Sequence, residues 1–164
     1  MKRRGRRCTA LAGALAVVLG GAAPALQAAA SCTVTATPVA FGVYDPLLST
    51  PRTATGRVTL RCTATGVAER VRSTIALSTG GSGSYALRSL FSGPERLNYN
   101  LFLNSTFTNI WGDGTAGSRV GTANLNVPAG AARTANLTVY GRIPALQSPA
   151  AGAFGDTIVV TVTY

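Results

Sequence analysis

Apolar and polar residues alternate along several short segments of this chain. Residues 58–62, for example, place Leu60 on an apolar face and Thr59 and Arg61 on a polar face. A period of two residues sends successive side chains to opposite faces of a β-strand. The pattern predicts six strands, at residues 32–41, 58–62, 71–78, 97–103, 135–140 and 158–164. No segment after Ser31 has the period of an amphipathic helix.

Turn-forming residues separate the predicted strands. Gly, Pro, Ser and Asp gather at residues 45–46, 80–83, 112–114 and 149–152, and Pro38 interrupts the first strand. Short strands spaced by turns are typical of an antiparallel β-sandwich. The predicted fold class is therefore all-β.

The N-terminal segment has the pattern of an export signal. Five basic residues within positions 2–7 precede an apolar run at 10–19, and Ala28 and Ala30 provide small residues at the spacing that signal peptidase recognises. We predict cleavage before Ser31, so that 1–30 is a signal peptide and 31–164 is the exported domain. The apolar run is too short to span a bilayer, so stable membrane insertion is not expected.

Two cysteines remain in the predicted exported domain, Cys32 and Cys62. An even number of cysteines outside the cytoplasm favours a disulfide, which would contribute on the order of 3 kcal/mol by restricting the unfolded chain. The alternative is a lipid on Cys32, because residues 29–32 loosely resemble a lipoprotein cleavage box. That alternative leaves Cys62 unpaired and lacks the usual leucine.

The net charge of +10 falls to +5 after removal of the signal, because five of the fifteen basic residues lie there. All basic residues of the exported domain are arginines. Biased amino-acid usage accounts for them most simply, and a polyanionic partner is the alternative. They are scattered from Arg52 to Arg142 without a run, which disfavours nucleic-acid binding.

The chain has no histidine, and this excludes Ser-His-Asp and Cys-His catalytic sites. Its five acidic residues are dispersed, whereas a glycosidase needs two that face each other across a sugar. Residues 112–115 fit a tight turn better than a calcium loop, which needs several oxygen ligands at fixed offsets. We therefore expect no catalytic residue, cofactor or metal, and no enzymatic activity.

Several motifs together resemble one known family. They are Phe-Gly-Val-Tyr-Asp-Pro at 41–46, Gly80 to Tyr85 with Arg88, Leu-Asn-Tyr-Asn-Leu-Phe at 97–102, Ile-Trp-Gly-Asp-Gly-Thr at 110–115, Tyr-Gly-Arg-Ile-Pro at 140–144, and Gln147, Gly152, Asp156 and Thr157 before the final strand. In this order they are similar to the spore coat protein U domain, the subunit domain of archaic chaperone–usher pili. The resemblance extends over essentially the whole exported domain.

The resemblance implies an immunoglobulin-like sandwich that lacks its last strand. A periplasmic chaperone would lend a strand to the subunit, and an outer-membrane usher would replace it with the N-terminal segment of another pilus subunit. The last strand would then line the acceptor groove with Ile158, Val160, Val162 and Tyr164. The C-terminal carboxylate of Tyr164 would be bound by basic residues of the chaperone. The implied location is the periplasm in transit, then the cell surface or the extracellular space.

A polymerising subunit also needs an apolar segment before its first cysteine, to donate to a neighbour. Cleavage before Ser31 leaves one residue there, and earlier cleavage leaves an Ala-rich segment that can contain Pro24, a poor strand former. The sequence thus predicts a subunit that accepts a strand but does not donate one, which suits a fibre tip.

The alternatives are a secreted coat or matrix protein that uses the same domain without an usher, a carbohydrate-binding module, and a small hydrolase. Trp111 and Tyr140 are expected to be core aromatics rather than a ligand-binding platform.

Overall fold

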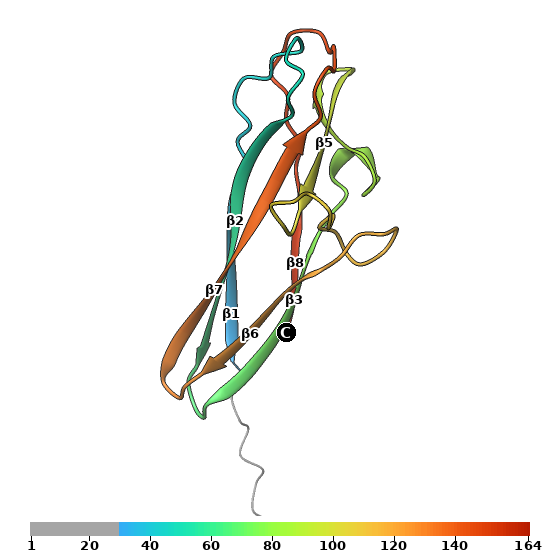
Figure 1. Cartoon of the computed structure of the whole chain (residues 1–164). Helices are drawn as coiled ribbons and strands as arrows, with labels where there is room; N and C mark the ends of the chain where they lie inside the picture. Colours follow the sequence, from blue (N-terminus) through green and yellow to red (C-terminus); the bar gives the residue numbers. More distant parts are fainter. Residues whose placement is uncertain (1–29) are drawn as a thin grey trace, which may run out of the picture.

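The computed structural model describes residues 30–164; most of the predicted signal segment, with its charged start, its apolar run and Cys8, lies outside the described residues. The described chain contains eight strands and one short 3-10 helix (Figure 1): β1 Ser31–Thr37, β2 Arg52–Ala64, β3 Glu69–Leu77, η1 Gly80–Ser82, β4 Arg88–Ser92, β5 Glu95–Phe102, β6 Gly121–Val127, β7 Ala131–Ile143 and β8 Val160–Thr163. No helix in residues 30–164 has the length and apolar character needed to cross a membrane.

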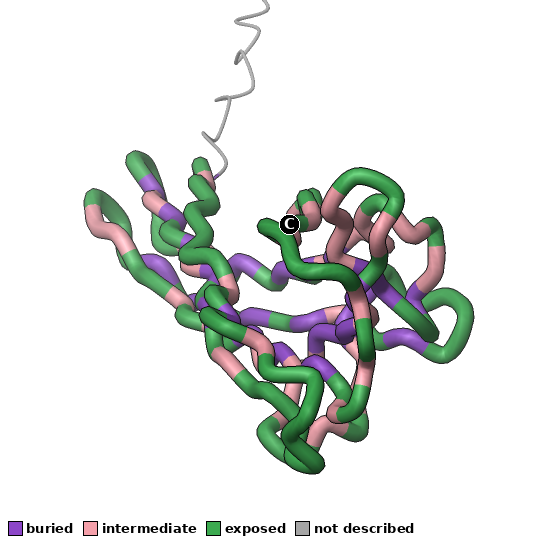
Figure 2. The backbone as a smooth tube through the Cα atoms, turned by 90° about the horizontal axis from the view of Figure 1, so that it is seen from above, coloured by how far each residue is buried: buried purple, intermediate pink, exposed green. Residues whose placement is uncertain are grey.

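The strands form two antiparallel sheets, ordered β1-β2-β7-β5-β4 and β6-β3-β8. The predicted all-β, antiparallel sandwich is confirmed. The longest pairing joins β2 to β7 along the full thirteen residues of each strand. Figure 2 shows buried and exposed residues alternating along the strands, as the sequence pattern predicts.

The core lies between the two sheets. Leu60 of β2, Ile75 of β3 and Trp111 of the β5–β6 connection are at most 1% exposed. The Trp111 indole N–H donates a hydrogen bond of 2.8 Å to the carbonyl oxygen of Ile75, so the one polar atom of this ring is satisfied inside the core. The prediction that Trp111 is a core aromatic is confirmed.

The prediction for Tyr140 is wrong. Tyr140 is half-buried and does not belong to the core cluster. Its neighbours along β7, Val139 and Gly141, are buried, and strand alternation therefore places Tyr140 on the outer face of the sheet.

The first strand ends at Thr37, four residues before its predicted end at 41. Pro38 follows directly, and proline has no backbone N–H to donate to a ladder. The chain then turns so that Phe41 still reaches the core, where it is 8% exposed. The final strand is also shorter than predicted, since β8 covers only Val160–Thr163 of the segment 158–164.

Two strands were not predicted, β4 and β6. Strand β6 alternates regularly in burial, but its inward residues include Gly121 and Ala123, which give a weak hydrophobic signal. Strand β4 begins with Arg88 and Ser89, which are both buried, so its pattern does not look apolar.

Candidate functional site: a groove between the first and last strands

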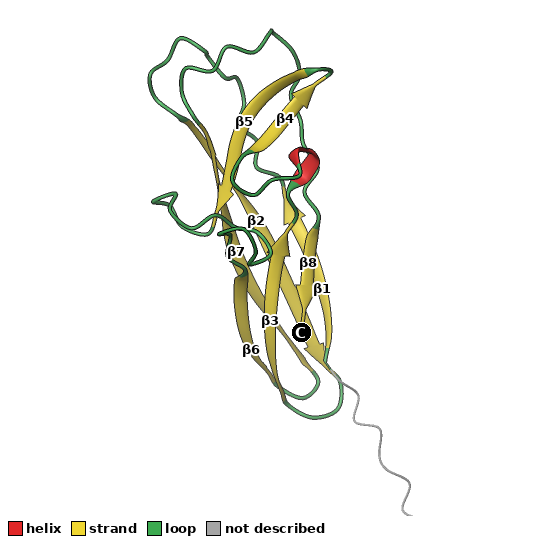
Figure 3. Ribbon diagram, turned by 90° about the vertical axis from the view of Figure 1, so that its right-hand side faces the viewer, coloured by secondary structure: helices red, strands yellow, loops and turns green. Residues whose placement is uncertain are grey.

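Strands β1 and β8 lie at the edges of different sheets (Figure 3). Strand β1 pairs only with β2, and β8 pairs only with β3 among the described residues. Each strand therefore has one free edge, and an unpaired edge presents a row of backbone donors and acceptors.

Hydrogen bonds identify the backbone groups on these free edges. The N–H of Cys32 points away from β2 and donates to the Tyr164 hydroxyl at 3.3 Å. Because alternate residues of an antiparallel strand point the same way, the backbone groups of Val34 and Ala36 share this direction. On β8, the carbonyl of Val159 accepts from the N–H of Ser78 at 2.9 Å, which places the backbone groups of Val160 on the opposite, free side.

An apolar cavity of about 190 Å³ opens between the two edges. Its lining includes Ala36 and Pro38 from the β1 side and Ile158 and Val160 from the β8 side. Its floor consists of core side chains: Val58, Leu77, Leu90, Tyr99, Leu101 and Val139. The core of the sandwich is therefore incompletely covered along this line.

The four residues predicted to line the groove lie along or beside β8. Ile158 and Val160 line the cavity. Val162 is half-buried and packs against the core below the cavity, where it pairs with Ile75 of β3. Tyr164 is 58% exposed, and its hydroxyl reaches the edge of β1 at the lower end of the groove. The proposed binding of its carboxylate by a chaperone stays a prediction.

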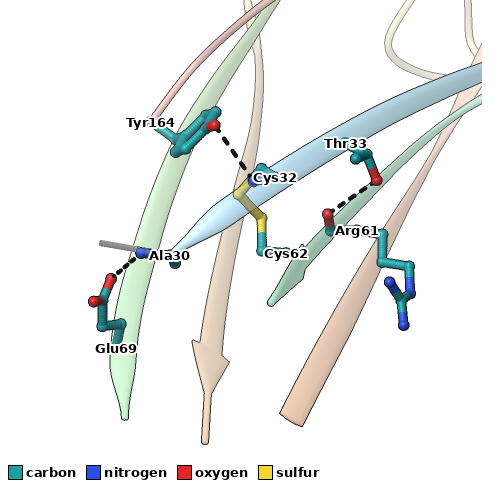
Figure 4. Close-up of a disulfide and its surroundings, with 7 residues drawn as sticks. All are labelled: Ala30, Cys32, Thr33, Arg61, Cys62, Glu69 and Tyr164. Carbon is teal, nitrogen blue, oxygen red and sulfur yellow. Dashed lines mark hydrogen bonds between the residues drawn. A yellow bond between two sulfur atoms is a disulfide. The ribbon is translucent and has the colours of Figure 1, made fainter. Parts of the chain in front are cut away.

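The predicted disulfide between Cys32 and Cys62 is present and joins directly opposite residues of β1 and β2, with their Cα atoms 4.0 Å apart (Figure 4). It closes a loop of 30 residues, for which about 3 kcal/mol of stabilisation is expected. In the uncleaved chain, the backbone N–H of Ala30, just before β1, also donates to the Glu69 carboxylate at 2.8 Å. Strand β1, which forms one wall of the groove, is thus covalently attached to β2.

A hydrogen-bonded carboxylate marks the upper end of the groove. Asp156 accepts from the Tyr99 hydroxyl at 2.7 Å, from the Gly81 N–H at 2.9 Å and from the N–H of Thr157 at 2.8 Å. Burial, and then the neighbouring Asp156, raise the pKa of Tyr99, so this hydroxyl stays a donor. Gly80 has φ +67°, and a Cβ there would overlap the Asp156 carboxylate, so glycine is required. In the sequence, Asp156 is one of five dispersed acidic residues and part of the family motif, and no local pattern there signals its contact with Tyr99.

A fully buried arginine, Arg88, connects the strands near the upper end of the groove. Arg88 donates to the carbonyls of Ser78, at 2.8 Å and 3.1 Å, and Trp111, at 2.7 Å, and to the side-chain oxygen of Asn100, at 2.7 Å. Burial lowers its pKa, and these oxygens compensate the buried charge. Arg88 thereby ties β4 and β5 to the end of β3. Its burial gave no signal in the sequence, because arginine is normally exposed.

Residues 30–164 contain no group of three or more His, Cys, Asp or Glu side chains that could hold a metal ion. At the candidate calcium loop, Asp113 instead accepts from the N–H and hydroxyl of Thr115, at 2.9 and 2.6 Å, which lowers the pKa of Asp113. This is the geometry of a side-chain-stabilised turn.

Comparisons with known proteins agree on one kind of domain. The sequence profile of the Spore Coat Protein U domain matches residues 20–161, a range that includes part of the predicted signal. Protein U of Myxococcus xanthus is 26% identical over 132 residues, which cover 76% of this chain and 70% of that protein.

A solved structure has a similar fold. It is a chain of the crystal structure of the CsuC–CsuE chaperone–tip adhesion subunit pre-assembly complex from archaic chaperone–usher Csu pili of Acinetobacter baumannii. The TM-score is 0.54 at 22% identity, and the match covers 82% of this chain. It spans 40% of the length of the solved chain, so the likeness concerns the fold of one part of that chain.

Proposed function

Because the chain belongs to the Spore Coat Protein U domain family, we propose that it is a structural subunit of an extracellular adhesive pilus assembled by the chaperone–usher route. In this proposal, a β-strand from another molecule occupies the groove between β1 and β8. The observation that carries it is the pair of unpaired strand edges on either side of an apolar cavity whose floor is the protein core.

An added strand would supply what this groove lacks, namely backbone hydrogen-bond partners and cover for its apolar side chains. It would provide hydrogen-bond partners for the backbone groups on the open sides of β1 and β8, each worth about 0.5–1.5 kcal/mol net. Its inward side chains would cover Ile158 and Val160, which are now only half-buried. Strand addition therefore stabilises this sandwich through the same interactions that hold its other strands.

The proposed partners act in sequence. A periplasmic chaperone would provide the first strand, and an outer-membrane usher would direct its replacement by another subunit. The solved Csu complex joins a chaperone to a tip adhesion subunit, and the fold that it shares with this chain supports the first step by analogy. The proposed location is the periplasm followed by the cell surface, and the role requires no catalysis.

The start of the exported domain is consistent with a position at the fibre tip. Ser31 already pairs with Thr63 of β2. With cleavage before Ser31, the exported chain would begin inside its own first strand. It could then accept a strand but would have none to donate.

The direct test is binding of a synthetic peptide with alternating Val and Thr, of about seven residues, the length of segment 158–164. Binding should raise the unfolding midpoint, and saturation at about 100 times Kd corresponds to about 2.7 kcal/mol. Val160→Glu places a charge inside the groove and should abolish the shift. The matched control, Thr161→Glu, lies on the exposed face and should preserve it. A protein whose unfolding midpoint does not respond to such peptides would contradict strand acceptance.

The family description also favours a second candidate, a coat or matrix protein that uses this domain without an usher. Expression of the exported domain without a chaperone distinguishes the two. A stable, soluble monomer with no response to peptides would support the coat protein, whereas aggregation that the peptide prevents would support the pilus subunit.

A further inference from the structure

The outer face of the five-stranded sheet carries an excess of positive charge. Strands β1, β2 and β7 are neighbours in this sheet (Figure 1), and together they contain five arginines and no acidic residue. Arg57, Arg61 and Arg142 alternate with buried residues, which places all three on the face away from the core. Figure 4 shows the Arg61 side chain extending away from the disulfide. The fold thus gathers on one surface arginines that are scattered in the sequence.

These three arginines follow one another at a regular spacing. Arg57 and Arg61 are four residues apart on β2, and Arg142 of β7 lies directly opposite Thr53, four residues further along β2. At roughly 3.3 Å per residue, one arginine recurs about every 13 Å along the strand direction. Phosphates follow one another at only about 3.4 Å along a nucleic-acid strand. The spacing therefore suits a polymer whose negative charges are far apart.

Hydroxyl groups flank the two arginines of β2 on this face. Each of these arginines has a threonine directly opposite it on both neighbouring strands. The four threonines, all exposed, are Thr33 and Thr37 on β1 and Thr134 and Thr138 on β7. A carboxylate at such a position would neutralise the guanidinium, whereas a threonine leaves its charge available and adds a hydroxyl that can donate or accept. The face therefore matches a partner that carries both negative charges and hydroxyl groups.

Aromatic rings lie at the Arg142 end of the line. Tyr140, which was expected in the core, points outward from β7 and lies directly opposite Phe102 of β5. Phe102 makes an edge-on contact with Phe107, with ring centres 5.5 Å apart, and the Arg142 guanidinium lies 5.6 Å from the centre of the Phe107 ring. A half-buried tyrosine offers an apolar ring face and a polar hydroxyl. The C–H groups of a sugar ring pack well on such a face.

From this arrangement we propose that the outer face of β1, β2 and β7 binds a linear polysaccharide in which carboxylated and neutral sugars alternate. Its carboxylates pair with Arg61, Arg57 and Arg142, its hydroxyls bind the flanking threonines, and one sugar ring packs on Tyr140. This face points away from the core, and of these residues only Arg57 also borders the groove between β1 and β8. The inference therefore goes beyond the proposed function and does not depend on strand acceptance.

The probe is a hyaluronan hexasaccharide, in which carboxylated sugars alternate with neutral ones, and its affinity is measured by isothermal titration calorimetry. Binding should weaken as salt is added, because exposed charges are screened. Chitohexaose has the same length without the carboxylates and should bind about tenfold more weakly or worse. Equal affinities for the two sugars would overturn the inference.

The paired variant Arg61→Gln with Arg142→Gln should lower the affinity for hyaluronan about tenfold, as expected for the loss of two exposed ion pairs. Arg57 is left unchanged because it borders the groove. The control, Arg70→Gln with Arg72→Gln, removes the same charge from exposed positions of β3 in the other sheet and should preserve the affinity within about twofold. An equal loss in both variants would mean that net charge, and not this face, attracts the polymer.

Tyr140→Thr tests the contact with the sugar ring. It should weaken hyaluronan binding about threefold to tenfold and leave the salt dependence unchanged, because no charge is removed. Arg61→Gln alone, at a fully exposed position, provides a second test that does not disturb the aromatic contacts of Arg142 and should cost about threefold. Unfolding midpoints of all variants show that they are folded.

Two further polyanions define the partner. Polyglutamate carries carboxylates without sugar rings, and a single-stranded oligonucleotide carries closely spaced phosphates. Either of them binding as tightly as hyaluronan would overturn the assignment to an acidic polysaccharide. A protein that responds to the alternating Val and Thr peptide but does not bind hyaluronan would refute this inference and leave the proposed function standing. The reverse result would refute strand acceptance alone.

Discussion

Strands β2 and β8 have the same alternation of apolar and polar residues but very different surroundings. Strand β2 is thirteen residues long and lies between β1 and β7, and its inward Val58 and Leu60 are each 1% exposed. Strand β8 is four residues long and, within residues 30–164, has β3 as its one neighbouring strand; its inward Val160 and Val162 are half-buried. Alternation decides which face a side chain occupies, whereas the number of neighbouring strands decides how well it is covered.

This difference teaches where the molecule is complete and where it depends on another chain. The pairing of β2 with β7 should be equally stable whether or not a partner strand is bound. The groove beside β8 should gain stability from an added strand. Four variants sharpen or break this comparison.

The largest effect is expected in the complete region. Leu60→Ala removes a buried side chain from the centre of β2 and should lower the free energy of unfolding by about 2–5 kcal/mol, measured by urea denaturation. Leu60 does not line the groove, so the loss should be the same with and without the Val and Thr peptide. A loss that the peptide reverses would mean that the two regions are not independent.

Removal of the disulfide tests the link between the regions. The double variant Cys32→Ala with Cys62→Ala should lower the free energy of unfolding by about 3 kcal/mol. It should also weaken peptide binding, because β1 forms one wall of the groove and loses its covalent attachment to β2. Reduction of the unmodified protein should reproduce both effects, and unchanged peptide affinity would show that β1 keeps its position without the bond.

A smaller and pH-dependent effect is expected at the upper end of the groove. Tyr99→Phe removes the hydrogen bond to Asp156 and should cost about 1.5 kcal/mol at pH 7. The pKa of Tyr99 is raised in the folded protein, so its contribution is fully present below the unfolded value near 10. That contribution is lost as the pH rises from there toward the folded pKa.

Urea denaturation of both proteins at pH 7 and above pH 10 checks this sign. The stability difference between the protein and its Tyr99→Phe variant should shrink at the higher pH. The other tyrosines are present in both proteins and cancel in the difference. A difference that stays constant, or grows, would contradict the assigned environment of Tyr99.

The smallest effect on the isolated protein is expected at the groove itself. Val160→Ala removes half-buried methyl groups and should cost about 1 kcal/mol in the absence of a partner. With bound peptide, the same change should cost more, since the added strand buries this position. Thr161→Ala, on the exposed face, is the control. An equal cost in the free and bound states would place Val160 outside the partner interface.

Much of the fold could be predicted from local patterns. Alternation located six of the eight strands because it depends on neighbouring residues alone, and an even pair of cysteines predicted the disulfide. Strand β4 was missed because Arg88 and Ser89 are buried through specific hydrogen bonds and not through an apolar character. Tyr140 was misplaced because aromatic side chains are usually well buried, although its alternation with Val139 puts it on the outer face of β7.

The sequence by itself determined the class of this protein: an all-β domain with a disulfide, without histidine chemistry, and with motifs that place it in its family. Only the tertiary structure decided that β1 and β8 become edges with a cavity between them, that Asp156 meets Tyr99 at its upper end, and that scattered arginines share one face of the five-stranded sheet. The physical reason is range. Alternation and turns are set by adjacent residues. A free edge, in contrast, exists only after all the other strands have paired, and these pairings join residues far apart in the chain. Cys32 and Tyr164, which are in contact across the groove, are 132 residues apart.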